Sequence, residues 1–365
     1  MTVNVVTAAK VVTPGGVLID HAVTIDEGRI VAITPATGTA DHAVLTPGFV
    51  DLQVNGHDDI NVATMTEGDW ARLRHLLLSQ GVTSWCPTLI TAPTSHYAER
   101  LDHLQRFTAD SASGPYVAGV HLEGPFLGAL AGAHENVPLG AIDLDWLRAL
   151  PDLVRLVTLG PERPNAAEAI KLLTARGVVV ALGHTAATYD ETIAAIDAGA
   201  RLYTHCFNAS GALGHREPGP AGAALTSDDV GVSLIVDNVH VHPAMVDLAR
   251  RAKSRDSVVL ITDAVGWRSG HLGSRDVEFR DGAPRLADGT LAGSALTMDA
   301  AVRNAVSNGG FGLVEAVLAA STNPARLLGL DDRGEIVVGA HADLAALSDD
   351  LHHRSTWFEG RRVHG

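Results

Sequence analysis

The stretch Val178-Val-Val-Ala-Leu-Gly-His184 places a histidine just past a five-residue apolar run. The same arrangement occurs three more times, with Glu123 behind residues 116–120, His205 behind residues 200–203, and Asp263 behind residues 258–261. Short apolar runs predict buried parallel strands, and the carboxyl ends of such strands carry the active site of a β/α barrel. A carboxylate and two imidazoles can bind one divalent metal ion, which leaves the fourth side chain free to transfer protons. The pattern predicts a metal-dependent hydrolase.

Around this stretch, apolar strand-like segments alternate with amphipathic helical segments. The expected strands are residues 48–52, 82–85, 117–120, 153–157, 178–182, 202–204, 232–236 and 258–261. The expected helices are residues 69–80, 166–176, 189–198, 243–253, 294–308 and 313–320. Eight strands with intervening helices predict an α/β fold, a closed (β/α)8 TIM-like barrel. A doubly wound open sheet is the alternative, because alternation alone does not require closure.

Both ends of the chain have a different pattern, in which short strand-like segments alternate with turns. In the first 46 residues, Asp26-Glu-Gly28 is typical of a hairpin turn. Near the other end, residues 334–338, 343–347 and 356–358 are expected strands. We therefore expect residues 1–46 and 333–365 to build one small β-sandwich domain, and residues 47–332 to form the barrel.

The composition excludes several classes of protein. The chain has 42 acidic and 27 basic side chains and a net charge of −15, which disfavours binding to nucleic acid or to an anionic membrane. No apolar run approaches the roughly 18 residues of a membrane span, and the first residues lack the pattern of a signal peptide. Two cysteines, Cys86 and Cys206, are too few for a disulfide framework, so we expect a cytoplasmic protein. A thiolate ligand at Cys206 is conceivable, but a small buried apolar residue is the favoured interpretation.

The candidate metal ligands have a suitable spacing. His184 and His205 lie 21 residues apart, about one strand–helix unit, so neighbouring strands can present both imidazoles to one point. Glu123 would reach that point from across the barrel. We expect one divalent metal ion per subunit, with zinc as the first choice and iron(II), cobalt or manganese as alternatives. Most of the 18 histidines must have ordinary structural roles, and only the shared position behind a strand favours metal binding here.

Asp263 is the candidate for proton transfer. A buried carboxylate without a partner is costly, so a metal ion, a water molecule or a cation is expected beside it. There it would take a proton from the attacking water and return it to the leaving nitrogen. The alternative is that Asp263 caps a helix after the eighth strand.

Several motifs resemble one known family. They are residues 45–56 (LTPGFVDLQVNG), 121–126 (HLEGPF), 183–185 (GHT), 204–209 (THCFNA), 216–219 (REPG), 261–264 (ITDA) and 291–298 (LAGSALTM). In this order, and over nearly the whole chain, they resemble the N-acetylglucosamine-6-phosphate deacetylases of the amidohydrolase superfamily. The resemblance implies a barrel with a small β-domain, and hydrolysis of an N-acetyl amino-sugar 6-phosphate to acetate and the amino-sugar phosphate.

The resemblance also implies roles for individual residues. Glu123, His184 and His205 would bind the metal ion, and Asp263 would act first as general base and then as general acid. His134 would contact the substrate near the acetamide. The sugar phosphate would be bound by Asn208, the backbone of Ala209, Arg216 and His240. Leu296 would belong to a segment that lines the acetyl side of the pocket. A homodimer is implied too, because in the family some phosphate contacts come from a neighbouring subunit.

The phosphate site can also be argued from the residues alone. Arg216 lies in a loop rich in glycine and proline, where its planar fork can bind two phosphate oxygens. His240, behind the strand expected at residues 232–236, could add a second donor. The alternative for Arg216 is an ordinary salt bridge with Glu217.

Gln53-Val-Asn55 occupies the place where many amidohydrolases have His-x-His, which indicates the branch with a single metal ion. Loss of these histidines could also mark an inactive scaffold, but the retained Glu123, His184, His205 and Asp263 argue against it. A dihydroorotase-like or dipeptidase-like enzyme would carry His-x-His and a carboxylated lysine, and none of the three lysines lies at the position of Glu123. A sugar-phosphate sensor would bind the ligand without releasing acetate. The glucosamine and galactosamine epimers are both left open.

Overall fold

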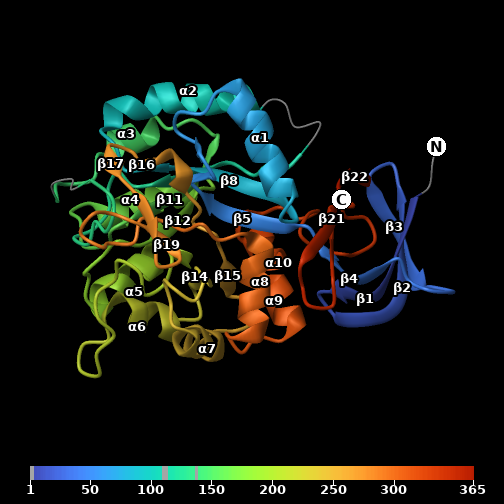
Figure 1. The fold of residues 1–365 in the computed structure, drawn as a ribbon. Coiled ribbons are helices and arrows are strands. Elements are labelled where there is room, and N and C mark those ends of the chain that lie inside the picture. The colour runs from blue at the N-terminus through green and yellow to red at the C-terminus, as the bar shows by residue number, and fades with distance from the viewer. Residues whose placement is uncertain (1–3, 109–113, 136–138) are drawn as a thin grey trace.

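The structure is a computed structural model that describes residues 4–108, 114–135 and 139–365. Its larger part is a barrel of parallel strands surrounded by helices (Figure 1). In order around the barrel, the strands are β5 (Phe49–Val54), β8 (Val82–Ile90), β10 (Val120–Glu123), β11 (Val154–Leu159), β12 (Val179–Leu182), β13 (Leu202–Tyr203), β14 (Gly231–Leu234) and β15 (Val258–Leu260). The short strand β9 (Tyr116–Val117) pairs with β8.

The two edges of this sheet meet. Val54, at the end of β5, forms a parallel bridge with Ala264, just beyond β15, and the Asp263 N–H donates to the Gln53 carbonyl oxygen at 3.0 Å. The barrel is nearly closed, so the prediction of a TIM-like barrel is confirmed, and the open doubly wound sheet is excluded. Seven of the eight predicted strands are present. The eighth, residues 117–120, is displaced, because Val117 ends β9 and Val120 begins β10.

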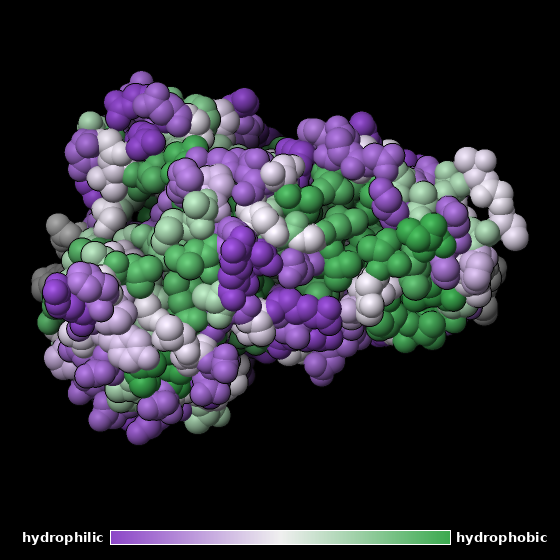
Figure 2. Space-filling model, turned by 90° about the horizontal axis from the view of Figure 1, so that it is seen from below, coloured by the Kyte–Doolittle hydropathy of each residue, from purple (hydrophilic) through white to green (hydrophobic). Residues whose placement is uncertain are grey.

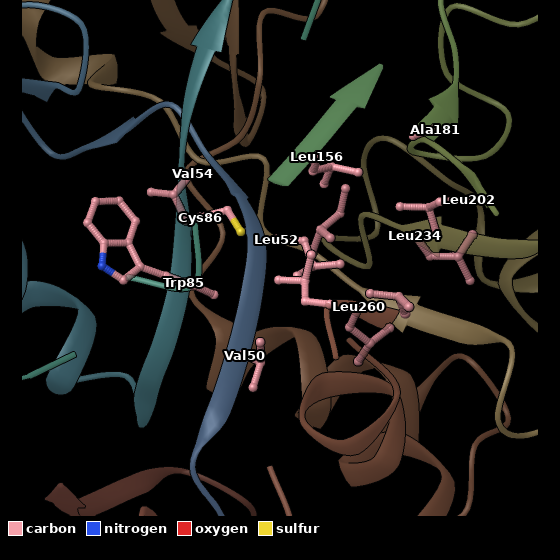
Figure 3. Close-up of a cluster of buried hydrophobic side chains, with 14 of the residues drawn as sticks. Val50, Leu52, Val54, Trp85, Cys86, Leu156, Ala181, Leu202, Leu234 and Leu260 are labelled. Carbon is pink, nitrogen blue, oxygen red and sulfur yellow. The ribbon is translucent and has the colours of Figure 1, made fainter. Parts of the chain in front are cut away.

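The apolar residues of these strands fill the barrel. Leu52, Leu156, Leu202, Leu234 and Leu260 gather at its centre (Figure 3), and each is at most 2% exposed. Burying one such side chain stabilises the fold by roughly 1.5–3 kcal/mol.

Helices form the outer layer of the barrel (Figure 1). They are α1 (Glu67–Leu78), α2 (Tyr97–Thr108), α3 (Leu144–Arg148), α4 (Ala166–Ala175), α5 (Tyr189–Ala198), α6 (Gly219–Thr226), α7 (Pro243–Ala252), α8 (Met298–Ser307), α9 (Leu313–Ala320) and α10 (Thr322–Leu327), with short 3₁₀ turns η1 (Thr94–His96) and η2 (Trp267–Ser269). The six predicted helices are confirmed, but α8 begins four residues later than expected. Ser294 instead bridges to Ala264 beside the barrel.

Four helices were not predicted, namely α2, α3, α6 and α10. The reason is clearest for α6, where every residue from Gly219 to Leu225 is buried. A helix without an exposed face has no apolar–polar period to recognise.

Both ends of the chain meet in a second sheet beside the barrel (Figure 1). Its order is β22 (Arg361–His364), β21 (His353–Phe358), β20 (Leu344–Leu347), β4 (His42–Pro47), β1 (Asn4–Thr13), β2 (Gly16–Asp26) and β3 (Arg29–Pro35). We refer to it as the terminal sheet. It has an apolar cluster of its own, which includes Val11, Val23, Leu45 and Leu344. Seen from below, apolar side chains gather over this part of the molecule (Figure 2). The domain boundaries at residues 46 and 333 stay a prediction, and residues 1–3 lie outside the described residues.

Two local predictions in the terminal sheet have different outcomes. The hairpin at Asp26-Glu-Gly28 is confirmed, because Glu27 (φ 47°) and Gly28 (φ 78°) form the two-residue turn between β2 and β3. The strand expected at residues 334–338 is wrong. This segment is bounded by Gly334 (φ 77°) and Gly339 (φ 99°), and with these left-handed residues at its ends it forms bends and turns.

Short hairpins stand over the carboxyl ends of the barrel strands. They are formed by β6 (Gly56–His57) with β7 (Ile60–Asn61), β16 (His271–Leu272) with β17 (Arg275–Asp276), and β18 (Glu278–Arg280) with β19 (Ala283–Arg285). The last two hairpins enclose a small apolar cluster that includes Val265, Leu272, Val277 and Leu286. In the described part of the chain, no helix is long and apolar enough to cross a membrane.

A half-buried histidine of β21, His353, predicts that the fold loses stability in acid. Burial, with the nearby His364, lowers the pKa of His353 from 6.5 to about 4. The unfolded chain therefore takes up this proton at a higher pH than the folded chain, so the contribution is complete above pH 6.5 and is lost as the pH falls from 6.5 to about 4. We expect an effect on the order of 2 kcal/mol.

The measurement is urea unfolding at pH 7.5 and pH 5. His353→Gln should lose less stability between the two pH values than the wild type, while the exposed neighbour variant His352→Gln should behave like the wild type. Equal losses in all three proteins would contradict the assignment.

Candidate active site

The four residues found behind apolar runs meet at one end of the barrel. Glu123 is the last residue of β10, and His184, His205 and Asp263 follow β12, β13 and β15 within three residues. All four side chains are buried, with exposed fractions of 2–9%.

Glu123, His184 and His205 form a compact triangle. Glu123 Oε1 lies 3.2 Å from His184 Nε2 and 3.0 Å from His205 Nε2, and the two Nε2 atoms are 3.0 Å apart. A divalent metal ion lies about 2.0–2.2 Å from nitrogen and oxygen ligands, and one point can satisfy that distance to all three atoms. The prediction that these side chains converge agrees with the geometry.

The electrostatics of the triangle also fit a cation. Burial alone would raise the pKa of Glu123, but the neighbouring imidazoles, His134 above all, hold that pKa well below its usual value. Burial lowers the pKa of His184, which keeps its imidazole neutral. His184 Nδ1 lies 3.1 Å from the Leu130 carbonyl oxygen, so Nδ1 carries the proton and Nε2 has a lone pair for a metal ion.

The backbone at this site has an unusual conformation. His184, His205 and Asp263 have φ values of 51°, 31° and 50°, in the left-handed region that side chains other than glycine rarely adopt. Such a residue costs on the order of 1–3 kcal/mol and persists only where the surrounding structure imposes it. At His184, His205 and Asp263, this conformation of the turn after the strand thus directs the side chain toward the site.

His134 is a competitor of His205 for the metal, because suitable atoms of Glu123, His134 and His184 lie within 4.8 Å of one another. However, His134 Nε2 is 3.5 Å from Glu123 Oε2, which is farther than His205 lies from the other carboxylate oxygen. The Thr91 N–H donates to His134 Nδ1 at 3.4 Å, so the proton of a neutral His134 sits on Nε2. His134 therefore presents a donor to the site, and His205 is the better third ligand.

Two amides hold Asp263. Gln53 Nε2 and Asn55 Nδ2 donate to Asp263 Oδ1 at 2.9 and 2.7 Å, and the Gln53 amide also donates to Glu123 Oε1 at 2.9 Å. Burial, with the charge of Glu123, raises the pKa of Asp263 to about 8. A cation beside this carboxyl would lower its pKa again. From the sequence, these two amides indicated only that the His-x-His motif is absent. The structure shows that they orient the carboxylate of Asp263, the candidate for proton transfer.

A cavity of about 310 Å³ is lined by Asn55, Glu123, His134, His184, His205 and Asp263. Asn208, Ala209 and His240 also line it, as expected for substrate contacts. His240 Nδ1 lies 2.6 Å from Asp237 Oδ2, which fixes the ring and leaves Nε2 free. Apolar residues complete the wall, including Ile90, Val265, Leu272 and Leu291, and of these only Leu291 lies in one of the motifs quoted from the sequence, residues 291–298.

Arg216 and Leu296 do not line this cavity. Arg216 is exposed, and within the described residues it has no salt bridge with Glu217, whose Oε1 instead accepts the Tyr189 N–H at 2.9 Å. Leu296 is buried, and its neighbours in sequence Leu291 and Gly293 line the cavity instead. Their roles stay predictions. Cys206 is fully buried, and burial raises the pKa of its thiol to about 12, in agreement with an apolar role.

A barrel with a carboxylate and two imidazoles at the carboxyl ends of its strands is typical of metal-dependent hydrolases. Residues 44–363 match the amidohydrolase family. The chain therefore belongs to the amidohydrolase family.

Its relatives locate it within the family. It is 38% identical to the N-acetylgalactosamine-6-phosphate deacetylase of Escherichia coli O157:H7, with 98% of each chain covered. It is also 38% identical to the N-acetylglucosamine-6-phosphate deacetylase of Homo sapiens, over 88% of this chain and 83% of that one. The structure of a mutant N-acetyl-D-glucosamine-6-phosphate deacetylase from Mycobacterium smegmatis, in complex with N-acetyl-D-glucosamine-6-phosphate, superposes with a TM-score of 0.93 at 35% identity, covering 100% of both chains. The resemblance read from the motifs to the amino-sugar-6-phosphate deacetylases is confirmed.

Proposed function

We propose that this protein hydrolyses N-acetylglucosamine 6-phosphate to glucosamine 6-phosphate and acetate, with one divalent metal ion per subunit. The observation that carries the proposal is the arrangement of Glu123, His184 and His205 opposite Asp263 and His134 in one cavity. The relatives are named for this reaction or for that of the galactosamine epimer.

Glu123, His184 and His205 would hold the metal ion, with zinc as the first choice and iron(II), cobalt or manganese as alternatives. When bound, such an ion lowers the pKa of water and polarises a carbonyl group. The remaining chemistry belongs to residues of the chain.

Asp263 accepts a proton from the water that attacks the acetamide carbonyl carbon. As the new C–O bond forms, the carbonyl oxygen gains negative charge, and His134 donates its Nε2 proton in a hydrogen bond to that oxygen. Asp263 then returns the proton to the nitrogen, the C–N bond breaks, and acetate and the amine leave. Gln53 and Asn55 keep the reactive carboxyl oxygen in place through both transfers.

His240, Asn208 and the backbone of Ala209 would bind the sugar phosphate, because they lie in the cavity wall beyond His205. Arg216 would complete the phosphate site, and its exposed loop is outside the cavity of its own chain. We propose a homodimer on the basis of the family resemblance. Two free, buried cysteines fit a reducing cytoplasm.

The test is acetate release from N-acetylglucosamine 6-phosphate, from its galactosamine epimer and from the unphosphorylated sugar, on protein of known metal content. We expect turnover of the glucosamine phosphate ester, little turnover of the free sugar, and about one metal ion per chain. If the enzyme prefers the galactosamine ester, the proposed substrate would change to N-acetylgalactosamine 6-phosphate. Binding without acetate release in metal-replete protein would indicate a sensor and refute the enzyme.

A further inference from the structure

A second cavity lies directly beside the catalytic one. Its volume is about 500 Å³, and its apolar lining includes Ile60, Met65, Ala92 and Pro93. Within the described residues, Ile90 is the one side chain that lines both cavities.

Three segments form the partition between the cavities. Each segment gives one residue to the catalytic side and the next residue to the second cavity, in the pairs Ile90 and Thr91, His134 and Glu135, and Leu272 and Gly273. Ile90 is the last residue of strand β8 and Thr91 follows it. Leu272 and Gly273 belong to the β16–β17 hairpin. The partition is therefore thin, about one side chain deep.

Ile90 is held firmly within this partition. The Tyr97 hydroxyl donates to the Ile90 carbonyl oxygen at 3.1 Å, and the following N–H, of Thr91, donates to His134. Ile90 Cδ1 lies 3.5 Å from the point where a side chain on Gly273 would begin. The isoleucine thus spans the gap between the barrel strand and the hairpin turn.

The position of Ile90 around the barrel determines which part of a substrate would meet it. In the order β5, β8, β10, β11, β12, β13, β14, β15, strand β8 stands opposite β13. Asn208 and His240, the candidate sugar-phosphate contacts, follow β13 and β14. An acetamide centred among Glu123, His134 and Asp263, with its sugar toward β13 and β14, therefore directs its acyl group toward β8.

We propose that Ile90 sets the length of the N-acyl group that this enzyme accepts. The inference rests on the deacetylase function proposed above and adds its acyl specificity. Ile90 closes the catalytic cavity behind the acetyl methyl group. A smaller residue joins the two cavities, and the second cavity then accommodates a longer alkyl chain.

The experiment compares kcat/KM for the N-acetyl, N-propionyl, N-butyryl and N-hexanoyl derivatives of glucosamine 6-phosphate, measured by release of the free amine. For the wild type we expect a fall of about 10-fold or more for each of the first added methylenes. Ile90→Ala should raise the ratio of butyryl to acetyl activity by about 10- to 100-fold. Leu291→Ala is the matched control, because Leu291 lines only the catalytic cavity, and it should leave this ratio within about 3-fold.

Ile90→Val provides a milder variant if the alanine variant is unstable, and it should raise the propionyl-to-acetyl ratio by at least about 3-fold. Unchanged ratios in Ile90 variants that still hydrolyse the acetyl substrate would refute the assignment, and so would an equal shift in Leu291→Ala. A wild type that hydrolyses the butyryl and acetyl substrates equally well would refute it too. If the wild type releases no amine from the acetyl substrate, the proposed function itself fails, and this inference with it.

Discussion

Replacing Asp263 with asparagine should lower kcat by at least about 10³-fold while the protein keeps its metal ion. The asparagine amide has nearly the same shape, but it cannot accept the proton of the attacking water or return one to the leaving nitrogen. Asp263 is not part of the Glu123–His184–His205 triangle, so the metal ligands remain in place. Steady-state kinetics and elemental analysis of the same sample measure both quantities.

Asp229→Asn is a suitable control for this change, because Asp229 is exposed and does not line the catalytic cavity. It should leave kcat and metal content unaltered. A near-normal kcat for Asp263→Asn would show that another group moves the proton. Loss of the metal ion from that variant would show instead that Asp263 is a ligand.

Exchanging either of two histidines should separate metal binding from carbonyl polarisation. His205→Asn should lose the metal ion and with it nearly all activity, because His205 Nε2 lies 3.0 Å from both Glu123 Oε1 and His184 Nε2. His134→Asn should keep the metal ion and lower kcat by about 10²–10³-fold, as expected when a donor to the developing oxyanion is removed. The physical reason is the tautomer: the Thr91 N–H occupies His134 Nδ1, so Nε2 carries a proton and has no lone pair for a metal ion.

Metal titration of the two apo variants is the decisive measurement, and each protein serves as the control for the other. If His134→Asn loses the ion while His205→Asn retains it, the third ligand is His134, and the cluster of Glu123, His134 and His184 is the metal site. Equal metal affinity in both variants would contradict a three-residue site of either kind.

The barrel could be predicted from the sequence because each of its strands is marked by the residues of the strand itself. A buried parallel strand must be apolar along its whole length, so eight such runs were visible. Seven of them are strands, and the eighth, residues 117–120, runs from the end of β9 to the start of β10. The helix α6 was missed because it is buried on all sides and has no period, and residues 334–338 were read as a strand although two glycines turn them. In both cases the neighbours in space, rather than the segment itself, decided the conformation.

The candidate site divides in the same way. The sequence alone indicated which side chains lie at one end of the barrel, because Glu123, His184, His205 and Asp263 each come shortly after an apolar run. Only the tertiary structure decided what those side chains do to one another: that Gln53 and Asn55 hold Asp263, that Thr91 sets the tautomer of His134, and that Ile90 separates two cavities. These contacts join strands far apart in the chain through atoms about 3 Å apart, and such distances depend on how the barrel closes rather than on any local pattern.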